Sequence, residues 1–113
     1  MRASELALCV LLGACTAGDD VPAPHISALI PDQAPGGAVI EITGNYFCQL
    51  PDVREDVPCT ITGAVEFGTV PGTATLWTDT LIMVEVPQGL TVPVRVRVLA
   101  GGHTSNSITF TPS

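Results

Sequence analysis

Apolar and polar residues alternate with a period of two along most of the chain after residue 25. The clearest run covers residues 92–99, where three valines alternate with Arg95 and Arg97. This period is that of a β-strand with one face on a core and the other in water. The sequence therefore predicts a strand over 92–99, with the valines inside and both arginines outside.

Further segments of the same kind lie between turn-forming residues, among them Pro35-Gly36-Gly37 and Pro87-Gln88-Gly89. These predicted strands are 25–30, 38–43, 65–67, 73–77, 81–86 and 107–111. No helical period follows Cys15. About seven strands at roughly ten-residue spacing, each with one apolar side, predict an all-β fold in the form of an antiparallel β-sandwich.

The N-terminal residues follow a different pattern. Leu6–Leu12 is an uninterrupted apolar run, followed by the small residues Gly13 and Ala14. As a helix, such a run spans only about 10–14 Å, whereas crossing a bilayer takes roughly 20 residues. The pattern indicates a signal peptide over residues 1–14 and no permanent transmembrane anchor.

The four residues Leu12-Gly13-Ala14-Cys15 resemble the lipobox of bacterial lipoproteins. The resemblance implies that Cys15 becomes the lipid-modified N-terminus, with residues 15–24 as a proline-bearing acidic tether and 25–113 as the domain. Thr16 follows the cysteine where some Gram-negative lipoproteins carry an aspartate for inner-membrane retention, so the expected location is the outer membrane. The alternative is a secreted protein cut near Ala14 or Ala17.

Composition limits the partners of the domain. The chain has 113 residues, enough for one ordinary domain, and a net charge of −7 with only 4 basic residues. Binding to nucleic acid needs lysine or arginine gathered on one face, and the sequence has no basic cluster. The sequence therefore predicts no nucleic-acid partner, and a membrane contact made through lipid.

Several segments, taken together in their order and spacing, resemble the IPT/TIG domain, which has an immunoglobulin-like fold. They are Ile26–Pro31, Gly36–Phe47, Val65–Gly68, Asp79–Pro87, Val94–Val98 and Ser105–Phe110. The segment from Phe47 to Gly63 is longer than the family often has. The resemblance implies a module without catalytic residues that binds a protein or a glycan, or acts as a spacer.

Cys48 and Cys59 form an even pair once Cys9 leaves with the signal peptide and Cys15 is acylated. In an oxidising compartment such a pair predicts a disulfide, here closing a loop of about a dozen residues. The alternatives are a two-cysteine metal site, which lacks nearby histidines, and free thiols.

The remaining candidate residues each have a structural alternative. Asp52, Glu55 and Asp56 are weak calcium candidates in a loop that is more typical of a solvated acidic segment. Tyr46 and Trp77 are possible ligand-stacking residues, with a half-buried tryptophan of the sandwich as the alternative. Arg95 and Arg97 are possible ligand contacts, with a cross-strand ion pair to Glu85 as the alternative.

The sequence contains no recognisable motif that brings an acid, a base and a nucleophile together, and His25 and His103 are isolated. We therefore expect no enzyme, no cofactor and no resident metal. The expected function is that of a membrane-anchored surface lipoprotein with one binding or spacer domain and an unknown protein or glycan partner in the periplasm or outside the cell. The alternative is an accessory subunit of a larger cell-envelope assembly, docked through an exposed strand edge.

Overall fold

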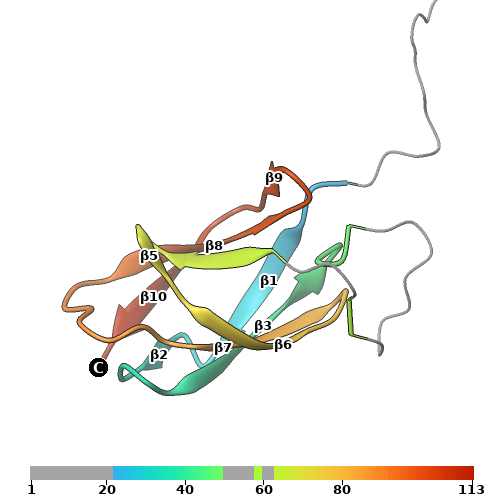
Figure 1. The fold of residues 1–113 in the computed structure, drawn as a ribbon. Coiled ribbons are helices and arrows are strands. Elements are labelled where there is room, and N and C mark those ends of the chain that lie inside the picture. Colours follow the sequence, from blue (N-terminus) through green and yellow to red (C-terminus); the bar gives the residue numbers. More distant parts are fainter. Residues whose placement is uncertain (1–21, 50–57, 60–62) are drawn as a thin grey trace, which may run out of the picture.

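The computed structural model describes residues 22–49, 58–59 and 63–113, and these ranges contain strands and no helix (Figure 1). The strands are β1 (His25–Ile30), β2 (Gln33–Ala34), β3 (Val39–Asn45), β4 (Ala64–Phe67), β5 (Val70–Pro71), β6 (Thr73–Trp77), β7 (Leu81–Glu85), β8 (Val94–Ala100), β9 (His103–Thr104) and β10 (Ile108–Pro112). Within the described ranges, no helix is long and apolar enough to cross a membrane.

The strands form two sheets that pack face to face. One sheet has four strands in the order β1-β3-β7-β6; the other has the order β2-β10-β8-β4-β5, with β9 paired to β8. This division of strands is that of an immunoglobulin-like sandwich. The predicted all-β sandwich is confirmed.

Alternation along the strands places the core between the sheets. Ile40 and Ile42 on β3 are fully buried, whereas Val39 on the same strand is 47% exposed. On β8, Val96 and Val98 are fully buried, whereas Arg95 and Arg97 are exposed. The remaining fully buried large side chains from both sheets are Ile26, Val65, Phe67, Ile82, Val84, Val86 and Phe110, together with Phe47 from the loop after β3.

All the predicted strands are present, with ends that move by up to two residues. The segment 38–43 becomes Val39–Asn45 and 92–99 becomes Val94–Ala100. The structure adds the two-residue strands β2, β5 and β9, which are too short to show a period in the sequence. One ladder, between β2 and the end of β10, is parallel; the other strand pairings among the described residues are antiparallel.

The two chain termini of the domain lie at opposite ends of the sandwich. The chain enters at the start of β1, and Figure 1 shows the C-terminus at the opposite end of the sandwich. We call the first the entry end and the second the far end. Loops 46–49, 78–80 and 101–102 lie at the entry end, and loops 35–38, 68–69 and 87–93 lie at the far end.

Asn106 closes one edge of the four-stranded sheet. Its Oδ1 accepts a hydrogen bond from the Ile26 amide (2.7 Å), and its Nδ2 donates to the Ile26 carbonyl (3.0 Å). Asn106 lies in the loop just before β10 of the other sheet, and its side chain occupies the place that a neighbouring strand would take beside β1. The edge at β1 is therefore blocked at this point against pairing with a further strand.

Gly72 is the residue at which the chain passes from one sheet to the other, between β5 and β6. Its amide donates to the Val65 carbonyl (2.9 Å), and a Cβ placed on it would lie 2.8 Å from both Phe67 Cε1 and Val84 Cγ2. Both of these neighbours are fully buried and cannot move aside freely.

We expect Gly72→Ala to lower the free energy of unfolding by about 1–3 kcal/mol, because the new methyl group overfills the core. The measurement is urea unfolding followed by the fluorescence of Trp77. Gly89→Ala is the matched control, since nothing lies within 4 Å of its Cβ although its φ is +91°. It should cost only the backbone strain, about 1 kcal/mol. Equal losses in the two variants would contradict the packing role of Gly72.

Candidate functional site

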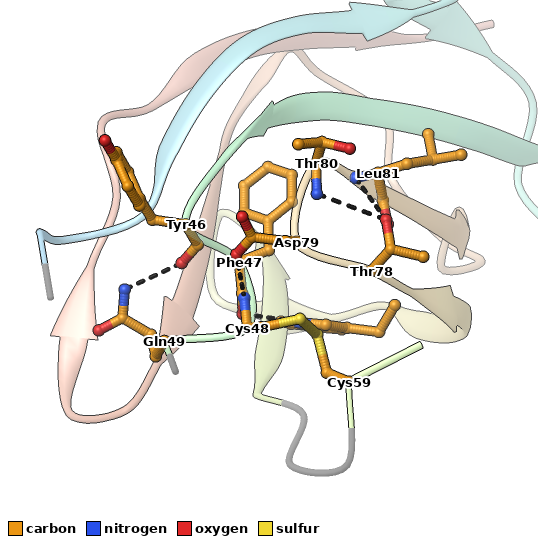
Figure 2. The surroundings of a disulfide bond; sticks show 10 residues. Tyr46, Phe47, Cys48, Gln49, Cys59, Thr78, Asp79, Thr80 and Leu81 are labelled. Carbon is orange, nitrogen blue, oxygen red and sulfur yellow. Dashed lines mark hydrogen bonds between the residues drawn. A yellow bond between two sulfur atoms is a disulfide. The ribbon is translucent and has the colours of Figure 1, made fainter. Parts of the chain in front are cut away.

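A disulfide between Cys48 and Cys59 lies at the entry end (Figure 2). The two Cα atoms are 5.3 Å apart and the residues are 11 positions apart in the chain. Cys48 is 2% exposed, and Cys59 is partly buried and packs against the core. The predicted pairing is confirmed, and the metal-site and free-thiol alternatives do not describe this pair.

Hydrogen bonds fasten both cysteines to the corner between β6 and β7. The Cys48 amide donates to Asp79 Oδ1 (3.2 Å), and the Phe47 amide donates to the Asp79 carbonyl (3.0 Å). The Cys59 amide donates to the carbonyl of Trp77 (2.8 Å). Figure 2 shows Asp79 directly beside Cys48. The bridge therefore joins two loop residues that are both hydrogen-bonded to the same sheet corner.

That corner is held by the side chain of Thr78, which is 6% exposed. Its Oγ1 accepts hydrogen bonds from the amides of Thr80 (3.4 Å) and Leu81 (3.0 Å), as drawn in Figure 2. A threonine hydroxyl that bonds to backbone two and three residues on is a common way to fix a tight turn.

Trp77 is part of the core, and the idea that it contacts a ligand is wrong for this structure. Its side chain is 4% exposed, and its Nε1 donates to the Phe47 carbonyl (2.8 Å). A stacking residue must show a ring face to the ligand, and this ring is covered. The alternative interpretation, a tryptophan of the sandwich interior, describes it. Tyr46 is 43% exposed, so of the two proposed stacking residues only Tyr46 has an accessible side chain.

Tyr46 and Gln49 both have left-handed backbone conformations, with φ of 66° and 60°. The side chain of Gln49 joins three segments: its Nε2 donates to the carbonyls of Pro22 (2.6 Å) and Tyr46 (2.9 Å), and its Oε1 accepts from Nδ1 of His103 (2.8 Å). Sequence reasoning missed Gln49, because a single amide side chain in a loop gives no pattern. Gln49 fixes where the N-terminal segment meets the domain.

Arg95 and Arg97 lie on the outer face of the six-stranded sheet. Arg97 donates to Glu66 Oε1 from Nη2 (2.7 Å) and Nε (3.0 Å), and Arg95 Nε donates to Ser107 Oγ (3.0 Å). The predicted pairing with Glu85 is wrong, because β7 belongs to the other sheet. The Arg97 side chain is 46% exposed and that of Glu66 is 30% exposed, so their ion pair stabilises the fold by only about 0.2–1 kcal/mol.

The lipidation candidate Cys15 and the calcium candidates Asp52, Glu55 and Asp56 lie outside the described residues. Within the described ranges, no three residues of the types His, Cys, Asp and Glu gather as metal ligands.

A shallow depression of about 430 Å³ lies at the entry end, between the start of β4 and the β8–β9 hairpin. Its lining is mainly glycine and alanine backbone, with His103 as its one ionisable side chain. A lone histidine beside backbone does not supply the set of acid, base and nucleophile that catalysis needs.

Comparisons with known protein families and solved structures agree with the sandwich fold described above. A family model described as the IPT/TIG domain matches residues 24–112. One similar solved structure is a Gamma-CGTase from Alkalophilic bacillus clarkii, with 24% identity and a TM-score of 0.65, covering 80% of this chain and 12% of that one. Another is a putative phosphatase from Bacteroides thetaiotaomicron VPI-5482, with 20% identity and a TM-score of 0.57, covering 81% of this chain and 18% of that one.

Both solved chains are several times longer than this one, and at these identities the likeness concerns the fold of one domain. A comparison with curated proteins gives no match. The family match spans most of the chain, including every strand of the sandwich. The IPT/TIG domain is in general a non-catalytic binding or spacer module, and this chain belongs to the IPT/TIG domain family.

Proposed function

We propose that this chain is a non-enzymatic lipoprotein of the bacterial cell envelope, whose IPT/TIG domain serves as a protein- or carbohydrate-binding or spacer module. The observation that carries the proposal is the position of Cys15, directly after Leu6–Leu12 and Gly13-Ala14 and ten residues before the domain. A signal peptide, a lipobox and a short tether then follow one another in the order that export and anchoring require.

The entry of the chain into the domain supports the same proposal. Pro22 is held by Gln49 at the entry end, so a lipid on Cys15 would leave the far end directed away from the membrane. Because Pro22 is held on the domain, residues 15–21 are the part of the tether that separates the domain from the lipid, and they reach about 20–23 Å when extended. That length would stand the domain clear of the lipid headgroups.

Anchoring by acyl chains suits a protein of this charge. Each buried CH₂ contributes about 0.8 kcal/mol, so two or three chains hold a protein stably. A net charge of −7 gives no electrostatic attraction to an anionic membrane. In a Gram-negative host we expect the outer membrane to be the location, because Thr16 follows Cys15 where some lipoproteins carry an aspartate for inner-membrane retention.

Replacing Cys15 with serine should abolish lipid labelling and release the protein from the membrane. The measurement is metabolic labelling with an alkyne fatty acid, combined with membrane fractionation and the intact mass of the extracted chain. Cys9→Ser is the matched control, because Cys9 lies within the apolar run and would be removed with it. Membrane retention of Cys15→Ser, or labelling that persists in it, would contradict the anchor.

The second candidate is an accessory subunit of an envelope assembly, and β6 is the observation that favours it. β6 is an edge strand of the four-stranded sheet; Thr73, Ala74 and Thr75 on it are exposed, and it contains no charged residue or proline. Such an edge can accept a strand from a partner. Constant co-purification with one envelope complex would favour this role, whereas a soluble ligand found by glycan array or pull-down would favour the first.

A further inference from the structure

The outer face of the four-stranded sheet carries more aliphatic side chains than the outer face of the six-stranded sheet, where Arg95 and Arg97 lie. The sheet registers place Ile30, Glu41, Met83 and Leu76 side by side across all four strands. Partners in register have Cβ atoms about 4.5–5.5 Å apart, so these side chains form a continuous row. Ile30 is 52% exposed even though it is a large aliphatic residue at the edge of that row.

A second row lies beside the first, toward the far end. It contains Val39, which is 47% exposed, and Glu85, its register partner. We call the surface formed by Ile30, Val39, Glu41, Leu76, Met83 and Glu85 the outer apolar–acidic face. A single exposed aliphatic residue is ordinary, but here the exposed Ile30 and Val39 share one sheet face with the partly exposed Met83 and Leu76, and such a grouping is typical of an interaction surface.

The charges on this face are of one sign. Glu41 and Glu85 are its ionisable side chains, and the four strands that form it contain no lysine or arginine. The arginines that the structure describes, Arg95 and Arg97, are both on the other sheet. Glu41 is half-buried and stands in the row between Ile30 and Met83, so aliphatic neighbours exclude part of its water.

We propose that the outer apolar–acidic face binds a partner strand whose exposed side carries aliphatic side chains next to a lysine or arginine. The inference rests on the proposed role as a binding module and names its surface and the chemistry of its partner. Along β3, Val39 and Glu41 are two residues apart, about 6.8 Å, which is the spacing of same-side residues on any strand. A strand aligned over β3 therefore sets an aliphatic side chain on Val39 and a cation on Glu41.

Charge complementarity selects this partner over a second copy of the chain. Two copies meeting through this face would bring Glu41 and Glu85 of each against those of the other, without a cation between them. Each copy also has a net charge of −7. Like charges placed face to face disfavour association, whereas a basic partner neutralises both carboxylates and covers Ile30, Val39 and Met83 at once.

The test is an NMR titration of the full chain with two synthetic peptides. The probe is Leu-Thr-Lys-Thr-Leu-Thr-Lys-Thr-Leu, which as a strand presents leucine and lysine on one side; the comparison peptide has glutamate in place of lysine. We expect the lysine peptide to shift the amide signals of β3 and β7, around Val39 and Met83, and the glutamate peptide to bind at least ten-fold more weakly. Glu41→Gln should weaken binding of the lysine peptide about three- to five-fold.

Glu66→Gln is the matched control, because it removes one carboxylate from the other sheet and should leave the affinity unchanged. Equal weakening by both variants, equal binding of both peptides, or association of the chain with itself would overturn the proposal. Shifts confined to β8 and β10 would overturn this surface while leaving the binding role intact. An absence of shifts with either peptide would overturn the surface alone, since membrane anchoring and ligand pull-down test the proposed function separately.

Discussion

Phe110→Ala should lower the free energy of unfolding by about 3–5 kcal/mol, the largest effect we expect from any single substitution in the domain. Phe110 on β10 is fully buried and packs edge to face on Phe67 of β4, with the ring centroids 5.4 Å apart and the planes at 87°. Removing the ring leaves a cavity between the two sheets and also removes the aromatic contact, which contributes about 0.5–1.5 kcal/mol of its own.

Thr109→Ala is the control for this experiment, since Thr109 is the exposed neighbour on the same strand. It should change stability by no more than about 0.5 kcal/mol. The measurement is urea unfolding with Trp77 as the reporter, because this is the one tryptophan of the chain and it is buried. A loss below about 1 kcal/mol for Phe110→Ala would mean that the sheets do not close on this pair of rings.

Removing the disulfide should cost about 3 kcal/mol, which is the loop-entropy contribution of a bridge that closes a loop of this length. The double variant Cys48→Ala, Cys59→Ala is the appropriate one, since a single substitution would leave an unpaired thiol. The unfolding midpoint should fall with little change in the signal of the folded state, because the surrounding hydrogen bonds of Asp79 and Trp77 do not depend on sulfur.

Reduction of the unmodified chain with dithiothreitol should produce the same decrease as the double variant. The double variant itself should be insensitive to the reductant. A reductant effect on the variant, or equal stability of the oxidised and reduced chains, would contradict a stabilising role for the bridge.

The strands could be predicted because each has one buried side, and burial of one side makes apolar and polar residues alternate along the sequence. The arrangement of strands could not be predicted in the same way. Arg97 pairs with Glu66, 31 residues away, and its predicted partner Glu85 lies on the other sheet. Alternation fixes which side of a strand is buried, but neighbours in a sheet depend on crossovers that leave no local pattern.

The candidate site shows the same division. Cys48 and Cys59 could be paired from the sequence, because two cysteines in a chain that is expected to be exported most often form a disulfide. Gln49 and Asn106 could not be found, since each acts through hydrogen bonds to distant backbone groups: Pro22 in one case and Ile26 in the other. The role of Trp77 could not be decided from the sequence, because an indole ring can pack inside a sandwich or stack on a ligand. The exposed fraction of its side chain in the structure distinguishes the two.

The positions of the two ends of the domain also have a mechanical consequence. The chain enters beside β1 and leaves after β10, at opposite ends of the sandwich, so tension applied between Pro22 and Ser113 acts along its strands. The amides of Thr111 and Ser113 donate hydrogen bonds to the carbonyls of Asp32 (3.0 Å) and Ala34 (3.1 Å), in the segment that follows β1, and these bonds lie across that direction. They would be loaded together, in shear, and would not open one at a time. We therefore expect these hydrogen bonds to resist tension between Pro22 and Ser113 as a group.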